Sequence, residues 1–384
     1  MRELKGKIKN HEIVVFKSDK CGKLTIDTTE NYLEALKVHT ESHEKIDLET
    51  ASKIEGKMNE HLAHFNKMFQ VGAAHSHEVR VTKASTSSNI LPPPLYGFRK
   101  THKKDQNGSS GPALRPVCGA KEAPNSRFSS FYSKIIYDLA DTVNDSRECK
   151  SSEEMRAAFR EFNTNVDENV RNRVQIYSMD VKSLYPSLRK SVCKDAAKWL
   201  VNKSGVSVEN VDWTQVTRYL AVNMTPEEID KEGVADVIPG RVKKTRRQLT
   251  MHSLYVNTAD KDWLPSKTPS EDQKRILLGL VMAIGIDTIM SNHTFMLGDD
   301  VFLQSEGGPI GLEATGAIAR AVMMWYDELY LEKVETEGYK LPLYERYIDD
   351  SNQGVVVEDG DVIEDVAIKL KACILGCDGV LIFK

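Results

Sequence analysis

Residues 344–357 read YERYIDDSNQGVVV and place two adjacent aspartates, Asp349 and Asp350, between strand-like segments. The surrounding apolar and β-branched residues predict a β-hairpin over residues 343–359 with the acidic pair at its tip. Neighbouring carboxylates repel each other, and aspartate is a poor strand former. Taken alone, the pair is best explained as a solvated turn. Only further acidic residues elsewhere in the chain would indicate a metal site.

A third aspartate supplies that indication. Residues 173–188, RVQIYSMDVKSLYPSL, predict an apolar strand that ends near Asp180 and turns at Pro186. Three carboxylates at one sheet edge would need counter-charge. Two Mg²⁺ ions, about 4 Å apart in two-metal sites, would supply it, and hard oxygen ligands suit Mg²⁺. The expected cofactor is therefore a pair of Mg²⁺ ions, with Mn²⁺ as a substitute.

Composition narrows the class of protein. The chain has 384 residues, 40% of them hydrophobic and 28% charged, which is typical of a globular protein. No apolar run approaches the roughly 20 residues of a membrane span, and the N-terminus lacks the apolar core of a secretory signal. Six cysteines in a chain of this length predict free thiols. We therefore expect an intracellular protein that is not secreted and has no membrane partner, with the nucleus as a compatible compartment.

Positive charge is concentrated in two segments although the net charge is −4. Residues 99–127 hold seven basic residues against two acidic ones, and residues 239–248, PGRVKKTRRQ, hold five basic residues and no acidic one. Local cation density of this kind suits a nucleic-acid backbone. Solvated loops are the alternative explanation.

Five motifs, in order, resemble a reverse transcriptase. Asp180 is followed by an apolar residue and, five positions on, by an aromatic one, and residues 347–350 form the aromatic–x–Asp–Asp motif. Between them, QSEGGPIGLEATGAIARAVM at 304–323 is similar to the family's Gly-rich turn and helix. Upstream, LYGFRKTHK at 95–103 and the segment beginning ALRPVCGAK at 113 resemble the fingers.

The branch of the family is indicated by the N-terminal part. VVFKSDKCGKLTI at 14–26 resembles the segment that precedes the fingers in Penelope-like retroelement polymerases, and the long segment after Asp180 points to that branch and its telomerase relatives. The resemblance implies an α+β fold, a right-hand polymerase with fingers and a palm, in which the palm is an antiparallel sheet backed by helices and a thumb is missing. The expected division is an N-terminal strand and helix extension at 1–85, fingers at 86–175, and a palm at 176–384 with an insertion at 200–300.

The resemblance also implies roles for residues around the acidic motifs. Asp180 and Asp349 would bind both metals, with Asp350 as the adjacent carboxylate. Val181 would offer its backbone carbonyl to the metal on the nucleotide side. Tyr185 would lie under the sugar, where an aromatic ring excludes a 2′-hydroxyl and favours deoxynucleotides.

Other implied roles concern the substrates. Arg115 would lie on the incoming base and grip the triphosphate, because guanidinium binds phosphate with a planar fork. Lys100, or otherwise Lys103, would bind phosphate, and Gln304 would touch the template strand. The turn that packs against the template and nascent base pair would consist of Gly308, Pro309 and Gly311.

The resulting functional prediction is a retroelement RNA-directed DNA polymerase whose partners are an RNA template, a DNA or RNA primer and dNTPs. The Gly-rich turn differs from that of the family at two points. Ile310 stands where relatives often have Gln or Met, and residues 312–315, Leu-Glu-Ala-Thr, follow the last glycine where most relatives continue with Ser–Pro. One alternative is an RNA-dependent RNA polymerase, against which Tyr185 argues. The other is a catalytically idle RNA-binding relic. The sequence does not indicate an oligomeric state.

Overall fold

The structure is a computed structural model and describes residues 2–19, 22–69, 91–100, 113–119, 126–143, 147–181, 183–208, 211–238, 267–309, 311–358 and 361–375. The chain forms two compact units, each assembled from separate stretches of sequence. Unit 1 consists of Met1–Ala63, Glu78–Tyr132 and Asp287–Thr315, and unit 2 of His64–His77, Ser133–Ile286 and Gly316–Lys384. The predicted domain boundaries at 85/86 and 175/176 stay predictions.

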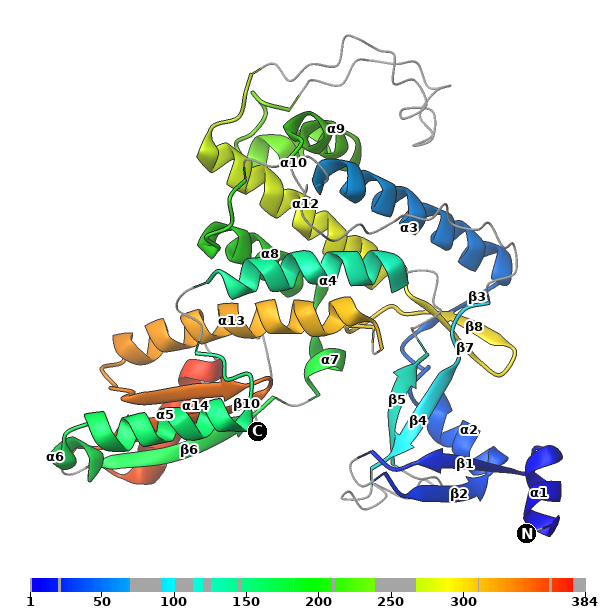
Figure 1. The fold of residues 1–384 in the computed structure, drawn as a ribbon, viewed down its shortest axis with the longest axis horizontal. Coiled ribbons are helices and arrows are strands. Elements are labelled where there is room, and N and C mark those ends of the chain that lie inside the picture. Colours follow the sequence, from blue (N-terminus) through cyan, green and yellow to red (C-terminus); the bar gives the residue numbers. More distant parts are fainter. Residues whose placement is uncertain are drawn as a thin grey trace. The chain divides into compact units, whose positions relative to one another are not determined.

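Unit 2 contains a three-stranded antiparallel sheet in the order β6 (Val174–Asp180), β10 (Asp350–Val356), β9 (Leu343–Tyr347) (Figure 1). Asp350 lies opposite Asp180 on one side and opposite Tyr347 on the other. The predicted hairpin with aspartates at its tip is confirmed. The sheet also brings the end of the predicted strand at residues 173–180 beside that tip.

Alternate side chains of β10 are buried on the face of the sheet that packs against a helix. Ser351, Gln353 and Val355 on β10 are each at most 1% exposed, and the Gln353 Oε1 accepts a hydrogen bond of 2.5 Å from the Tyr330 hydroxyl of helix α13 (Glu313–Thr336). Residues two apart share one face of a strand. Helix α13, which the resemblance to the family's Gly-rich turn and helix implied, therefore covers one face of the sheet.

Helix α5 (Ser152–Asn165) contacts β9, and helix α14 (Ile363–Leu375) follows β10 along the chain (Figure 1). Helix α5 has an N-terminal cap, since the Ser151 hydroxyl accepts the Glu154 N–H at 3.2 Å. The sheet is joined to α14 by the Tyr177 hydroxyl, which donates to the Ile363 carbonyl. The short helices α6 (Glu168–Arg171) and α7 (Leu184–Ser187) precede and follow β6.

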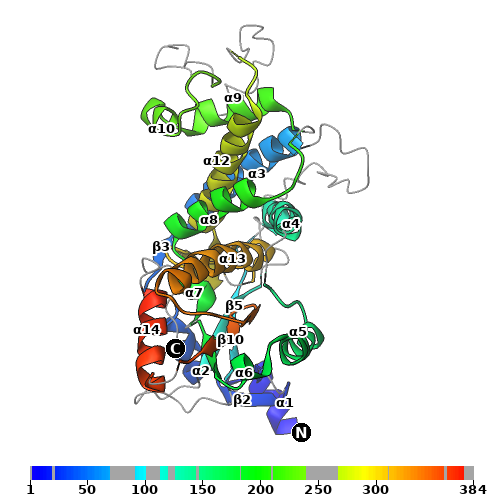
Figure 2. The ribbon, with the colours of Figure 1, turned by 90° about the vertical axis from the view of Figure 1, so that its left-hand side faces the viewer.

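The rest of unit 2 is helical. Helix α12 (Glu271–Ser291) begins beside α9 (Trp213–Asn223) and α10 (Pro226–Lys231), as Figures 1 and 2 both show. The Arg275 Nη1 donates to the last carbonyls of α8 (Lys190–Lys203), at 3.0 Å from both Val201 and Ser204. The first part of the predicted insertion therefore forms a packed helical layer.

Unit 1 contains three small antiparallel sheets. They are β1 (Ile13–Lys17) with β2 (Leu24–Thr28), β4 (Leu95–Arg99) with β5 (Leu114–Cys118), and β3 (Glu44–Ile46), β8 (Asp300–Leu303) and β7 (Thr294–Leu297). The turn of the β1–β2 hairpin includes Gly22 at φ +63°. The core of this unit is formed by Leu36, Leu95, Leu114, Cys118 and Phe295.

Helices surround these sheets. They are α1 (Arg2–Lys9), α2 (Thr29–Lys37), and the unit 1 parts of α3 (Leu48–Phe69) and α4 (Ser126–Asp141). Helices α2 and α3 are separated in sequence by the short strand β3. Both units therefore combine helices with small antiparallel sheets.

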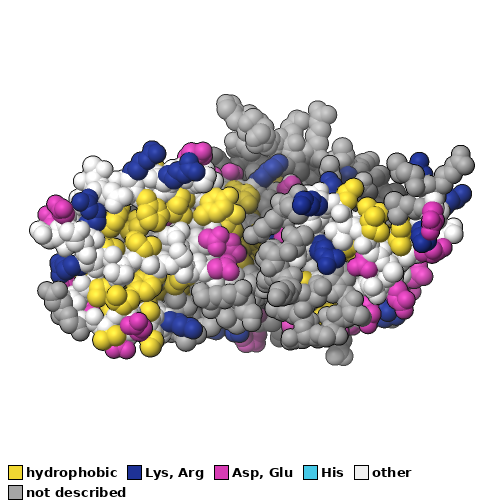
Figure 3. Space-filling view, turned by 90° about the horizontal axis from the view of Figure 1, so that it is seen from below, with side chains coloured by type: hydrophobic (Ala, Val, Ile, Leu, Met, Phe, Trp, Pro, Cys, Tyr) yellow, Lys and Arg dark blue, Asp and Glu magenta, His cyan; other side chains and the backbone are white. Residues whose placement is uncertain are grey.

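The surface of unit 2 carries apolar side chains. Figure 3 shows hydrophobic side chains gathered on the face of this unit that is viewed from below. Its exposed large apolar residues include Ile176, Val362, Ile363 and Ile368. None of the helices described in the structure combines the length and the apolar character needed to cross a membrane.

Gly354 tests the packing of the central strand. A Cβ at Gly354 would lie 2.8 Å from Val174 Cγ1 and 3.2 Å from Leu343 Cβ, on the two neighbouring strands. We expect Gly354→Ala to destabilise the protein by about 1–3 kcal/mol, the usual cost of overpacking, measured by urea unfolding. Gly56→Ala is the control, because Gly56 is an exposed position of helix α3 with no atom within 4 Å of its Cβ position. Gly56→Ala should stabilise the protein by roughly 0.5–1 kcal/mol. If both variants changed the unfolding free energy equally, Gly354 would not be closely packed between its neighbouring strands.

The described cysteines Cys118, Cys149, Cys193 and Cys373 are buried free thiols, as predicted. Burial raises the pKa of the Cys118 and Cys193 thiols to about 12. Since the thiolate is the reactive form, we expect neither residue to be alkylated by iodoacetamide at pH 8 until the protein is unfolded in urea. Peptide mass spectrometry before and after unfolding checks this, and rapid modification of Cys193 in the folded protein would contradict it.

Candidate metal centre

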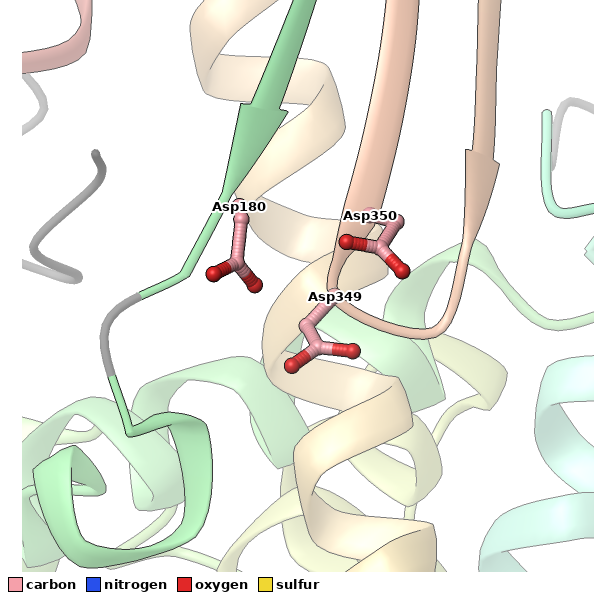
Figure 4. A group of neighbouring side chains, drawn as sticks. All are labelled: Asp180, Asp349 and Asp350. Atoms are coloured by element: carbon pink, nitrogen blue, oxygen red, sulfur yellow. The ribbon is translucent and has the colours of Figure 1, made fainter. Parts of the chain in front are cut away.

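Three aspartates from distant parts of the sequence meet at one edge of the unit 2 sheet. Asp180 ends β6, Asp349 lies in the β9–β10 turn, and Asp350 begins β10 (Figure 4). Each contributes one carboxylate oxygen to a group whose members all lie within 4.8 Å of one another. Asp180 and Asp349 are half-buried and Asp350 is exposed. The structure thus brings the predicted metal ligands together.

The charges in this group oppose one another. Asp180 and Asp350 are directly opposite in the antiparallel ladder, an arrangement in which like charges are destabilising. Within the part of the chain that the structure describes, no lysine or arginine forms an ion pair with either of them. A set of three carboxylates without histidine or cysteine fits a hard divalent cation such as Mg²⁺.

The turn that carries Asp349 has an unusual backbone. Ile348 has φ +57°, and the left-handed region is costly for a β-branched residue. The Ile348 carbonyl accepts a hydrogen bond of 2.9 Å from the Arg346 Nη1. The Val181 N–H, just past the end of β6, donates to the Asp349 carbonyl at 3.4 Å. These contacts connect the backbone at Asp349 to both flanking strands.

Arg346 is part of a buried polar network behind the turn. Its side chain is fully buried, and its Nε donates to the Asp327 Oδ2 at 2.8 Å. The Tyr344 hydroxyl donates to the other oxygen of Asp327 at 2.7 Å. Burial raises the pKa of Asp327, against the opposing effects of Arg346 and Tyr344. The carboxylate of Glu148 lies 3.7 Å from Arg346 and also accepts from Arg320.

Tyr185 lies next to the metal centre. Ser183, at φ +57°, directs the chain from β6 into helix α7, and Tyr185 in that helix is half-buried. Tyr185 and Ile348 both line a cavity of about 390 Å³ in unit 2. Its remaining wall is formed mainly by Gly316, Ala319, Arg320 and Met323 of α13 and by Tyr137 of α4. The predicted sugar contact therefore borders a cavity beside the acidic turn.

The predicted substrate-binding residues of the fingers lie in unit 1. Arg115, on β5, is half-exposed and pairs with Asp19 at 3.2 Å. Lys100 follows β4, and its backbone N–H donates to the Ala113 carbonyl. Lys103 and the basic segment 239–248 lie outside the described residues. Phosphate binding by Arg115 and Lys100 stays a prediction.

The Gly-rich turn also belongs to unit 1, and it is held by its own side chains. Gly308 and Pro309 are buried, whereas Gly311 is exposed at φ +110°, a conformation that favours glycine. The Thr315 hydroxyl donates to the Pro309 carbonyl at 2.5 Å. Thr315, in the segment 312–315 that differs from the family's Ser–Pro, therefore closes the turn with its hydroxyl. Ile310 lies outside the described residues.

Gln304 is buried beside this turn. Its amide nitrogen donates to the carbonyls of Glu306 and Gly307, at 3.0 and 3.2 Å. Its observed contacts thus stabilise the turn, and a contact with the template strand stays a prediction.

Sequence reasoning missed the network of Arg346, Asp327 and Tyr344. The available signal was an arginine inside an otherwise strand-like apolar pattern, three residues before Asp349. Because such a residue is ordinarily exposed, the local pattern did not indicate that Arg346 lies in the interior.

No model of a known protein family and no curated protein matches the sequence. Solved structures do match. Telomerase from Candida albicans, in complex with a TWJ fragment of telomeric RNA, aligns with a TM-score of 0.53 and 12% identity over 99% of this chain and 50% of its own. Apo telomerase from Candida tropicalis aligns with a TM-score of 0.50 and 11% identity over 98% of this chain and 52% of its own.

The chain therefore has a fold similar to that of telomerase, a reverse transcriptase, and spans about half the length of these neighbours. The mixed helix and sheet architecture predicted from the sequence is confirmed at this level. The Penelope-like branch and the division into fingers and palm stay predictions.

Proposed function

We propose that the chain is an RNA-directed DNA polymerase of a Penelope-like retroelement, which adds dNTPs to a primer 3′ end on an RNA template. The observation that carries the proposal is the convergence of Asp180, Asp349 and Asp350 at one edge of an antiparallel sheet. The telomerase-like fold supports the same class of reaction.

The carboxylates would hold the metal ions. When bound, two Mg²⁺ ions would activate the primer hydroxyl and stabilise the leaving pyrophosphate. Asp180 and Asp349 are the half-buried members of the group and would bind both ions, whereas the exposed Asp350 would be less directly engaged. The Val181 carbonyl would be the additional ligand on the nucleotide side. The chain contributes positioning and charge, as in other phosphoryl transfers.

Further residues would recognise the substrates. In unit 2, Tyr185 would contact the sugar of the incoming dNTP. In unit 1, Arg115 and Lys100 would bind its triphosphate, and the turn at Gly308, Pro309 and Gly311 would contact the template and nascent base pair. The proposed nucleic-acid partners are an RNA template and a DNA or RNA primer, held largely by backbone contacts and by A-like shape.

Primer extension tests this function. The purified chain is incubated with a labelled primer annealed to an RNA template, dNTPs and Mg²⁺. We expect template-directed extension that EDTA abolishes and Mn²⁺ restores. Asp365→Asn serves as the control, because Asp365 is an exposed carboxylate on α14 outside the metal centre. Its extension should equal that of the wild type.

An RNA-binding relic without activity is the second candidate, favoured by the altered sequence at residues 312–315. In that case the chain would bind the RNA–primer duplex but would not extend it with either metal. Binding measured by fluorescence anisotropy in parallel with extension separates the two functions.

The Tyr185 side chain should determine the choice of sugar. We expect Tyr185→Ala to lower the preference for dCTP over CTP, as a ratio of kcat/KM values, by roughly tenfold to a hundredfold, the range that a small substituent is worth in a pocket. Tyr185→Phe keeps the ring and should retain the preference. An unchanged preference in Tyr185→Ala would remove the sugar role and reopen the RNA-dependent RNA polymerase alternative.

A further inference from the structure

We propose that Arg346 is a positioning residue for the metal centre: its buried guanidinium holds the peptide that precedes Asp349 and thereby sets the affinity of the site for divalent cations. The inference rests on the proposed function only for the identity of the site as a two-metal centre. Arg346 itself does not belong to the group of metal-binding carboxylates.

The contact is direct. Arg346 Nη1 donates to the Ile348 carbonyl at 2.9 Å, and this carbonyl belongs to the peptide whose nitrogen is that of Asp349. A hydrogen bond to a charged donor is stronger than one between neutral groups. The guanidinium therefore fixes the plane of the peptide from which the Asp349 side chain projects toward Asp180.

The conformation that Arg346 holds is one that the chain would not adopt by itself. Ile348 is β-branched and lies at φ +57°, and nearly half of the residue (47%) is exposed to solvent. Without the bond to its carbonyl, relaxation of Ile348 toward negative φ would be favourable. That relaxation would rotate the peptide and move the Asp349 carboxylate away from Asp180.

Arg346 is in turn held on several sides. Its Nε donates to Asp327 at 2.8 Å, and the Tyr344 hydroxyl fixes the other oxygen of Asp327 at 2.7 Å. The backbone of Arg346 is also paired with the segment at 147–149: its N–H donates to the Arg147 carbonyl at 3.1 Å, and its carbonyl accepts from Cys149 at 2.7 Å. Asp327 of α13, oriented by Tyr344 of β9, thus holds the Arg346 guanidinium against the turn, and the segment 147–149 holds the Arg346 backbone.

A purely structural role would have a different consequence. If Arg346 only neutralised Asp327, its replacement would lower stability and leave the cation affinity of the folded protein unchanged. If it positions Asp349, the folded protein itself binds cations more weakly. Residues that orient metal ligands typically contribute about tenfold to a hundredfold to metal affinity.

The test is direct binding of Mn²⁺ to the full chain, measured from the EPR signal of free Mn²⁺ and requiring no catalysis. We expect Arg346→Lys to keep the charge near Asp327 but to lose the fork that reaches both Asp327 and Ile348, and to raise the Kd by about tenfold or more. Arg275→Met is the matched control, because Arg275 also donates to two backbone carbonyls, but at the end of α8. Its Kd should equal that of the wild type.

A second variant covers the case in which Arg346→Lys does not fold. Tyr344→Phe keeps the buried ring and removes only the hydroxyl that orients Asp327, so it should weaken Mn²⁺ binding in the same direction by a smaller factor. Wild-type affinity in the folded variants would overturn the positioning role. Failure of the wild type to bind Mn²⁺, or unchanged binding by Asp349→Asn, would instead overturn the metal centre, and with it the proposed function.

Discussion

Asp180→Asn is expected to lower primer extension by about a thousandfold or more while making the metal-free protein more stable. A bound metal contributes several kcal/mol to the stabilisation of developing charge in phosphoryl transfer, and about 4 kcal/mol corresponds to a thousandfold in rate. Asparagine has nearly the shape of aspartate but removes one charge from the group formed with Asp349 and Asp350. The loss should therefore appear in kcat.

The stability effect of the same variant has the opposite sign. Asp180 lies directly opposite Asp350 in the β6–β10 ladder, and removing one of two opposed like charges stabilises such a pair by roughly 0.2–1 kcal/mol. In EDTA, Asp180→Asn should unfold at a slightly higher temperature than the wild type. With Mg²⁺ present, the wild type should gain stability by ligand binding and the variant should gain less.

Differential scanning calorimetry in EDTA and in Mg²⁺ measures both stability effects, the higher unfolding temperature of the metal-free variant and its smaller gain on adding Mg²⁺. Asp365→Asn, an exposed carboxylate on α14, is the control and should follow the wild type in both buffers. A lower unfolding temperature of Asp180→Asn in EDTA would show that the Asp180 carboxylate has a stabilising partner. Retained extension by this variant would exclude it as a metal ligand.

Local patterns predicted the elements that carry the metal centre. The β9–β10 hairpin and the strand ending at Asp180 each have a periodic apolar pattern or turn signal within a short window. Such signals depend on neighbouring residues alone. The placement of Asp180 beside Asp350 is a property of tertiary pairing, and it was predicted only because the order of the motifs resembled a known fold.

Features that depend on burial were not predictable in the same way. Arg346 has the sequence character of an exposed strand residue and is instead fully buried against Asp327. The amide of Gln304 donates to two carbonyls of its own turn, contacts that the local pattern did not predict, and its contact with the template strand stays a prediction. The β7–β8 hairpin was missed, although Gly298 at φ +62° marks its turn, because its strands are short and adjoin the Gly-rich motif. In each case the deciding contacts are made by residues that the local pattern does not specify.

Arg346→Met is expected to destabilise the protein by about 3–5 kcal/mol, the cost of leaving one partner of a buried ion pair without its counter-charge. The charge left behind is that of Asp327, which is 6% exposed. Burial already raises the pKa of Asp327 in the presence of Arg346, which acts in the opposite direction together with Tyr344. Without Arg346, the pKa of Asp327 should rise further, and the carboxyl group should take up a proton on folding.

The pH dependence separates this mechanism from a simple loss of packing. A carboxyl group whose folded pKa lies above its unfolded value makes the protein less stable as pH rises through the folded pKa. The difference in unfolding free energy between Arg346→Met and the wild type should therefore be larger at pH 8 than at pH 6, as measured by urea unfolding. Arg275→Met, which loses hydrogen bonds to the Val201 and Ser204 carbonyls, should show the same difference at both values.

Removing the charges of both Asp327 and Arg346 separates the effect of Arg346 on stability from its effect on metal binding. The double variant Asp327→Leu with Arg346→Met should recover most of the lost stability, because a buried pair replaced by apolar residues is often neutral or stabilising. It also removes the donor to the Ile348 carbonyl, so the turn at Asp349 loses its anchor while the fold remains intact. A double variant as unstable as Arg346→Met would show that Asp327 is not the origin of the cost. Recovered stability together with weak Mn²⁺ binding would separate the contribution of Arg346 to the metal centre from its contribution to the fold.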